Sequence, residues 1–144
     1  MNFLMGLIFE RALEMAWMDR EREVRPELVR IGEVQVDGVI GTVDAFDTRL
    51  GHPEEYKCTK MSCRQPIDDP KFYHYWMQLK AYCYMLGAST GVLWVLHVNG
   101  NYSREPTDPE SGYVLKGYLA KFSQNELREN WNMHINHAKR KGWL

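Results

Sequence analysis

The chain has 144 residues, of which 44% are hydrophobic and 26% charged, and its formal net charge is -1. This length can bury a core without disulfides or structural metals, so we expect residues 1–144 to form a single domain. The near-neutral charge excludes a whole-molecule basic field of the kind that many nucleic-acid-binding proteins carry. Binding to a nucleic acid would therefore depend on a local site that gathers cations.

The first nine residues are mostly apolar, but they lack a basic start and a small-residue cleavage site, and charged residues follow from Glu10 onward. No apolar run approaches the length that spans a bilayer. Three cysteines, Cys58, Cys63 and Cys83, cannot form a complete set of disulfides. We therefore expect no membrane segment and a reducing compartment such as the cytoplasm.

Residues 2–22 have the periodicity of an amphipathic helix. One stripe carries residues at spacings of three and four: Phe3, Leu7, Glu10, Glu14 and Trp17. A neighbouring apolar stripe is predicted to widen the buried face: Leu4, Ile8, Met15 and Met18.

Extended structure is predicted next. Segments 28–36 and 39–47 are rich in β-branched residues and meet at Asp37-Gly38, a dipeptide suited to a tight hairpin turn. A loop at 51–53 precedes a third extended segment at 55–61. The first half therefore predicts a helix followed by a three-stranded meander.

The second half begins with a helix that starts at Asp69-Pro70 and ends at Gly87, a typical cap pair. Its apolar stripe is predicted to face the sheet: Phe72, Trp76, Leu79, Cys83 and Leu86. Segment 91–98 is almost continuously apolar, as in a buried central strand.

After a loop, segment 113–122 is a further predicted strand. Ser123 and Glu126 then form a capping box for a last helix. The predicted order α-β-β-β-α-β-β-α gives an α/β or α+β layer sandwich.

Two acids and a lysine form the centre of the candidate site. Glu55 and Lys57 are alternate residues of one predicted strand, so they project from the same face. Asp44 lies on the preceding predicted strand, with ten residues between it and Glu55. An antiparallel pairing brings the three side chains together. Carboxylate oxygens suit magnesium, which also binds phosphate, and a lysine beside it can stabilise charge developing on the phosphate.

Three further residues extend this group. Glu10 lies on an apolar helical stripe, where a carboxylate needs a partner such as a metal. Gln78 and Tyr82 share one face of the second helix and can position a ligand or contact a phosphate or a base. Each signal alone is weak, because a single acid-x-Lys spacing often arises by chance and lone helical residues are more often solvated surface. Their order and the element on which each one falls favour a functional site.

These motifs resemble those of the PD-(D/E)XK nuclease superfamily, in its RecB-type and phage lambda-exonuclease-like branches. The segments that carry the resemblance are 6–12 around Glu10, 41–45 around Asp44, 55–59 with Glu55 and Lys57, and the Gln-x-x-x-Tyr motif of 78–82. RecB-type members commonly have His where this chain has Glu10, so the first helix is nearer to the lambda-exonuclease type.

The resemblance implies a restriction-endonuclease-like core, in which helices flank a central mixed sheet. It assigns metal binding to Glu10, Asp44 and Glu55, and catalysis to Lys57 with Asp44, Glu55 and Gln78. It implies Mg²⁺ or Mn²⁺ as cofactor. Some relatives hold an iron–sulfur cluster on four cysteines, but this chain has three in other places, so we expect no cluster.

The implied activity is DNA hydrolysis, with exonuclease action in phage or bacterial recombination or repair as the first hypothesis. A single-strand annealing protein or a helicase is a candidate partner. Tyr82 and Lys60 are the predicted DNA contacts, and the basic stretch 139–141 either lines a DNA path or is a solvated helix end. A structure-selective endonuclease such as a Holliday-junction resolvase and a non-catalytic DNA-binding subunit are the alternatives. The sequence does not decide the polarity of cleavage, the preference for single or double strands, or whether the substrate is DNA or RNA. It also leaves the oligomeric state open.

A structural zinc site is the weaker metal hypothesis. Cys58, Cys63 and Cys83 lack the short pairing typical of such sites, although His52 and His74 are available. Cys58 is also predicted to point away from Glu55 and Lys57, into the core.

Overall fold

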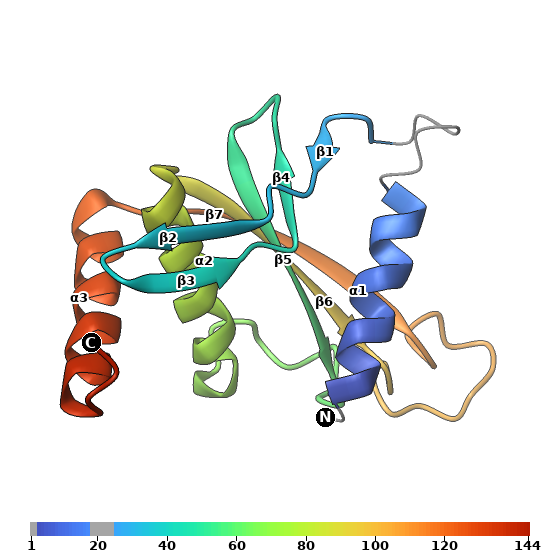
Figure 1. Ribbon diagram of the computed structural model, residues 1–144. Coiled ribbons are helices and arrows are strands. Elements are labelled where there is room, and N and C mark those ends of the chain that lie inside the picture. Colours follow the sequence, from blue (N-terminus) through green and yellow to red (C-terminus); the bar gives the residue numbers. More distant parts are fainter. Residues whose placement is uncertain (1–2, 18–24) are drawn as a thin grey trace.

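The computed structural model describes residues 3–17 and 25–144 (Figure 1). Within these ranges the helices are α1 (Phe3–Trp17), α2 (Tyr73–Leu86) and α3 (Gln124–Arg140), with a short 3-10 turn at Pro70–Phe72 before α2. The strands are β1 (Leu28–Val29), β2 (Glu33–Val36), β3 (Val39–Thr42), β4 (Ala45–Asp47), β5 (His52–Thr59), β6 (Thr90–His97) and β7 (Val114–Lys121). Among the described helices, none has the length and apolar character to cross a membrane.

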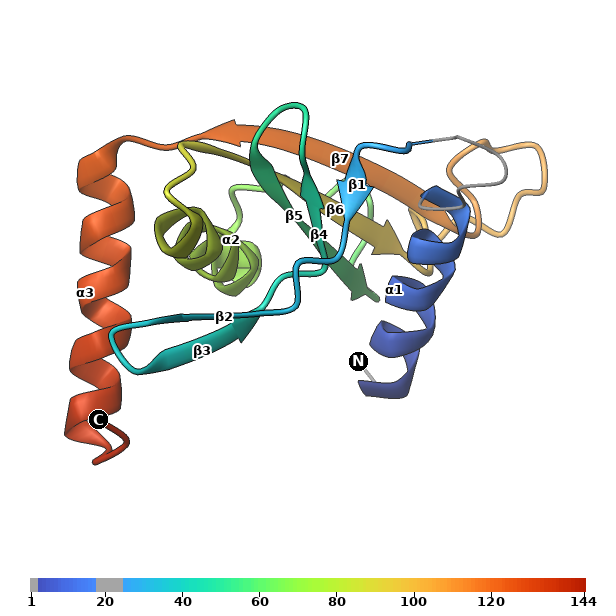
Figure 2. The same ribbon diagram turned by 45° about the horizontal axis from the view of Figure 1, so that its top comes forward.

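The central sheet has five strands in the order β1-β4-β5-β6-β7. Strands β5 and β6 run parallel, while the other neighbours are antiparallel, so the predicted mixed sheet is confirmed. Helix α1 lies on one face of the sheet, and α2 covers the other face with α3 beside it (Figures 1 and 2). The fold class predicted from the sequence, helices flanking a mixed sheet, is therefore correct.

The predicted three-stranded meander is wrong in detail, because each long extended segment is divided between two sheets. Segment 28–36 breaks at Gly32, which has a φ of 76°, and segment 39–47 breaks between Thr42 and Ala45. The inner halves, β2 and β3, form a separate hairpin turning at Asp37-Gly38 as predicted, and both turn residues have positive φ. The outer halves, β1 and β4, join the central sheet. The third segment begins earlier than expected, at His52.

Helix α1 buries a different face from the one predicted. Phe9 and Leu13 are buried, with Trp17 packed beside them against the sheet. Leu4, Leu7 and several other residues of the expected apolar stripes are exposed instead. A helix that rests on the sheet along only one narrow line buries an i, i+4 set and leaves its remaining apolar residues outside. The expected continuation of this helix over 18–22 lies outside the described residues.

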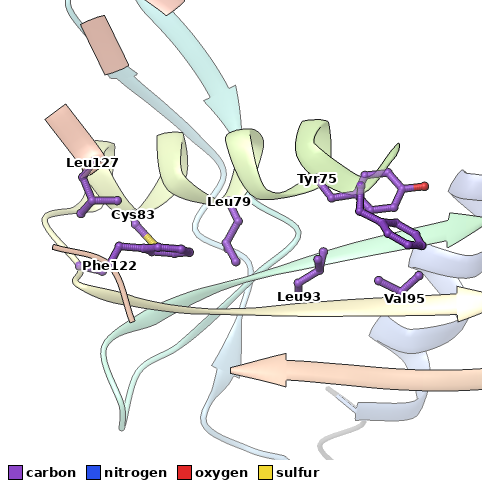
Figure 3. Close-up of a cluster of buried hydrophobic side chains, with 9 residues drawn as sticks. Tyr75, Leu79, Cys83, Leu93, Val95, Phe122 and Leu127 are labelled. Carbon is purple, nitrogen blue, oxygen red and sulfur yellow. The ribbon is translucent and has the colours of Figure 1, made fainter. Parts of the chain in front are cut away.

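Helix α2 holds the larger core against the sheet (Figure 3). Gly87 ends the helix with a φ of 66°, as the sequence predicts. The predicted start is wrong in detail: Asp69 accepts a hydrogen bond from the backbone N–H of Lys71, but it caps the 3-10 turn Pro70–Phe72, and α2 itself begins at Tyr73 without a side-chain cap. Leu79 and Cys83 are fully buried in this cluster. The predicted capping box at the start of α3 is also present.

The two cores lie on opposite faces of the sheet. Cys83 belongs to the cluster under α2, whereas Cys58 belongs to the cluster under α1, the side opposite to Glu55 and Lys57 as the alternation of the strand predicts. All three cysteines are buried and free.

Gly117 of β7 allows Trp94 of β6 to lie flat against the sheet. A Cβ at this position would be 2.4 Å from the indole, which is also held by Trp17 at a ring separation of 4.6 Å and by Glu54. We predict that Gly117→Ala lowers the free energy of unfolding by about 1–3 kcal/mol, measured by urea titration. Gly6→Ala, in an open helical position, is the control and should stabilise by a few tenths to about 1 kcal/mol. A Gly117→Ala protein as stable as the parent would contradict this packing.

Candidate active site

An interrupted edge of β5 forms the base of the site. Strand β4 pairs with only the first residues of β5, ending at Ala45 opposite Glu54, and in the described part of the chain no strand continues along that edge. Asp44 therefore lies just outside β4, not on a strand as predicted. Its Oδ2 accepts a hydrogen bond from the backbone N–H of Tyr56 at 2.8 Å. A side-chain carboxylate thus takes the place of a ladder carbonyl and is held beside Glu55.

A chain of polar contacts runs from β5 to α2. Lys57 Nζ donates to Glu55 Oε1, and it also donates to Gln78 Oε1 at 2.7 Å. Gln78 Nε2 in turn donates to the hydroxyl of Tyr82 at 3.1 Å. The ring of Tyr75 lies 5.9 Å from Lys57 Nζ. The lysine is therefore fixed between an acid of the sheet and an amide of the helix.

Glu10 reaches the same place from α1. Its Oε1 accepts from Arg30 Nη2 at 2.5 Å. A cleft of about 400 Å³ lies between α1, β5 and α2. Its walls are Gly6, Leu7, Glu10, Asp44, Glu55, Tyr56, Lys57, Cys58, His74, Tyr75 and Gln78. The structure therefore brings together Glu10, Asp44, Glu55, Lys57 and Gln78, five residues that come from three separate elements and the segment before β4.

Burial controls the electrostatics of this cleft. It raises the pKa of Glu55 to about 8, and the nearby charge of Asp44 adds to this effect while Lys57 opposes it. Burial likewise raises the pKa of Asp44 to about 6, against the hydrogen bond from Tyr56. The two carboxyl groups thus repel each other in water-poor surroundings, and both would be more stable as anions beside a cation.

The donor atoms fit a hard divalent cation. Glu55 is 1% exposed, and its Oε2 is buried without a hydrogen-bond partner in the described structure. Such an orphaned carboxylate oxygen is costly unless something binds it. Oxygen donors of Glu10, Asp44 and Glu55 with room for water match the preference of magnesium or manganese.

Two residues predicted as DNA contacts lie outside the cleft. Tyr82 is 8% exposed, and its hydroxyl is occupied by Gln78. Burial raises the pKa of Tyr82 to about 12, so this hydroxyl stays protonated. Its ring packs on the hairpin at Gly41, where a Cβ would come within 2.8 Å of it. Lys60 follows the end of β5 and is exposed, and it is not among the cleft residues.

Three residues of the site were not predicted to belong to it, although His74 was named as an available ligand for a zinc site. His74 and Tyr75 line the cleft, and Arg30 pairs with Glu10. His74 carries a usable signal, because it lies four residues before Gln78 on the same helical face. No sequence pattern indicates Arg30, because its contact with Glu10 of α1 depends on the path of the chain between β1 and β2.

A second acidic group lies at the start of β5. Asp47, His52 and Glu54 are buried with ligand atoms within 4.8 Å of one another, so this group could bind a metal. Arg25, however, already places a cation there: its Nη2 lies 2.6 Å from Glu54 Oε1 and 3.5 Å from Asp47 Oδ2. Trp94 Nε1 also donates to Glu54 at 3.0 Å.

The remaining atoms of this second group are largely used by the fold. Asp47 Oδ1 accepts from the backbone N–H groups of Arg49 and Leu50 in the β4–β5 turn, at 2.9 and 2.7 Å. His52 Nδ1 lies 3.4 Å from the hydroxyl of Thr90. We therefore interpret this group mainly as a buried ion pair that fixes the turn, in which Asp47 Oδ2 is fully buried without a hydrogen-bond partner among the described residues.

Comparison with known proteins supports the fold. The chain is similar in structure to a phage-related exonuclease from Haemophilus somnus, with a TM-score of 0.60 and 12% identity over 94% of this chain and 69% of that one. It is also similar to the protein SSO0001, with a TM-score of 0.50 and 18% identity over 90% of this chain and 58% of that one. No protein-family model and no curated protein sequence matches it.

The chain therefore shares the fold of these two structures, and in the described residues this fold is a mixed sheet flanked by three helices, the architecture that the motifs predicted. It spans about two thirds of the exonuclease and less than two thirds of SSO0001. Its residues also include buried acidic groups with the chemistry to bind a metal.

The raised pKa values predict how metal stabilises the protein. Asp44 and Glu55 bind protons more tightly in the folded protein than in the unfolded chain, so between about pH 4 and 8 the metal-free protein loses stability as pH rises. A divalent cation removes this penalty. We predict that Mg²⁺ or Mn²⁺ raises Tm by about 5 °C or more at pH 8 and by much less at pH 5, measured by thermal unfolding.

Two variants localise this effect. Glu55→Gln should lose most of the metal-dependent rise at pH 8, because the amide is a poor ligand. The exposed Glu110→Gln should keep it. An equal rise at both pH values, or one that survives in Glu55→Gln, would show that the cation binds elsewhere.

Proposed function

We propose that the protein is a metal-dependent nuclease that hydrolyses phosphodiester bonds of DNA, and that it acts as an exonuclease in recombination or repair. The observation that carries this proposal is the convergence of Glu10, Asp44, Glu55 and Lys57 in one cleft. The motifs that resemble those of PD-(D/E)XK nucleases support it, as does the structural similarity to a protein named a phage-related exonuclease.

The cleft residues divide into two functional groups. Glu10, Asp44 and Glu55 would hold Mg²⁺ or Mn²⁺, and the bound ion supplies Lewis-acid chemistry that acidifies a water molecule and neutralises phosphate charge. Glu55 Oε2, buried and without a partner in the described structure, is the atom that most needs such a ligand.

Lys57 would act on the reacting phosphate. Its ammonium group donates to Glu55 and Gln78, so it is oriented before the substrate arrives. One further N–H of Nζ would then be free to donate to a phosphate oxygen. Gln78 is a positioning residue, and Tyr82 holds its amide in place. This arrangement needs little reorganisation during the reaction, which is how fixed charges lower a barrier.

The direct test is cleavage of end-labelled linear double-stranded, linear single-stranded and closed circular DNA, with Mg²⁺, with Mn²⁺ and with chelator. We expect metal-dependent loss of linear DNA that spares circles. Lys57→Ala should lower kcat by about 100-fold or more while the protein remains folded. The exposed Lys121→Ala is the matched control and should leave kcat unchanged.

The other outcomes separate the alternatives. Cutting of circles or of four-way junctions would identify an endonuclease. Binding of DNA without cleavage by either metal would identify a non-catalytic DNA-binding subunit. Activity that persists in Lys57→Ala would contradict the assignment of this cleft.

A further inference from the structure

A second, larger cavity adjoins the cleft. It measures about 560 Å³ and lies between the β2–β3 hairpin, α2, α3 and the residues that follow α3. We call it the hairpin groove. His74 and Gln78 line both the cleft and the groove, so the two spaces lie side by side along α2. Figure 2 shows the hairpin extending from the sheet toward α3, past the side of α2.

The walls of the hairpin groove are held in place by specific contacts. Trp131 of α3 donates from Nε1 to Asp37 Oδ2 at the hairpin tip, at 2.8 Å, and its ring stacks on Tyr84 of α2 at 5.0 Å. On the other wall, Gly41 of β3 admits the ring of Tyr82. The groove is therefore a preformed feature of the fold.

The chemistry of the groove is apolar with aromatic rings and imidazoles. Apolar side chains line most of it, among them Val39, Ile40, Met77, Ala81, Met85 and Trp143. No lysine or arginine is among its described lining residues, so it does not suit a phosphate. His134 contributes an Nε2 atom that is shielded and without a hydrogen-bond partner in the described part of the chain. Such walls suit a flat heteroaromatic ring with polar edges.

We propose that the hairpin groove binds unpaired bases of the DNA strand whose phosphate lies in the cleft, so that the substrate is a single-stranded or frayed end. This inference rests on the proposed function and names the substrate form. A strand bound in the cleft would reach the groove past Gln78, which lines both spaces. The exposed Lys139, Arg140 and Lys141 follow at the end of α3, where they are available to backbone phosphates outside the groove. The volume of about 560 Å³ lies within the range of small-ligand sites.

Ile40 allows a test with a matched control. It is 59% exposed on β3 in the groove, while Leu119 is 71% exposed on β7 and outside the groove. Ile40→Glu and Leu119→Glu introduce the same charge at exposed strand positions. Ala81→Leu adds a neutral variant that fills the groove from α2 without changing charge.

The measurement is fluorescence anisotropy with a labelled single-stranded oligodeoxynucleotide of about ten nucleotides, in chelator so that no cleavage occurs. A blunt duplex of the same sequence is the competitor. We expect the parent protein and Leu119→Glu to prefer the single strand. Ile40→Glu and Ala81→Leu should each weaken single-strand binding by about fivefold to 150-fold, the range that corresponds to one stacked base.

Each result decides one of the two proposals. If the protein cuts DNA with metal but both groove variants bind like Leu119→Glu, the groove is not a base site and the nuclease assignment stands. If the groove variants lose single-strand binding but no cleavage occurs with either metal, the base site stands and the catalytic assignment fails. If the parent protein binds the duplex as tightly as the single strand, or binds neither, the groove proposal is overturned.

Discussion

The site depends on one electrostatic constraint: the fold buries the carboxyl group of Glu55 and satisfies only one of its oxygens. Lys57 contacts Oε1, while Oε2 has no hydrogen-bond partner among the described residues, and Asp44 adds a second carboxyl group nearby. Burial and mutual repulsion raise both pKa values. A folded protein retains such an arrangement at a cost in stability, and a bound divalent cation offsets that cost. The metal-binding interpretation follows from this imbalance.

The geometry follows from the late start of strand β4. Because β4 begins only at Ala45, opposite Glu54, the edge of β5 beside Glu55 is left open, and Asp44 completes the ladder with its side chain. Helices on both faces can then contribute to one cleft: Glu10 arrives from α1 and Gln78 from α2. The second acidic group, at the start of β5, lies where β4 is paired with β5. Arg25 forms an ion pair with Glu54 there and helps to fix the β4–β5 turn.

Much of this could be predicted from the sequence because local patterns determined it. Neighbouring residues alone determine the Asp37-Gly38 turn, the end of α2 at Gly87, the capping box of α3 and the apolar β6. The spacing of Glu55 and Lys57 required only the alternation of a strand. The predictions were wrong where contacts between residues distant in the sequence determine the strand pairing or the buried face of a helix. The split of 28–36 and 39–47 between two sheets, and the burial of Phe9 where Leu7 was expected, depend on how elements pack. The pairing of Arg30 with Glu10 and the hairpin groove likewise have no local signal.

Anomalous diffraction from crystals of the protein grown with Mn²⁺ would locate the metal itself and is the most direct test of metal binding in the cleft. We expect a peak in the cleft, bound by carboxylate oxygens of Asp44 and Glu55 with Glu10 nearby. A peak at Asp47, His52 and Glu54 instead, with Arg25 displaced, would contradict it. So would a cleft that holds no manganese at saturating concentration and alkaline pH.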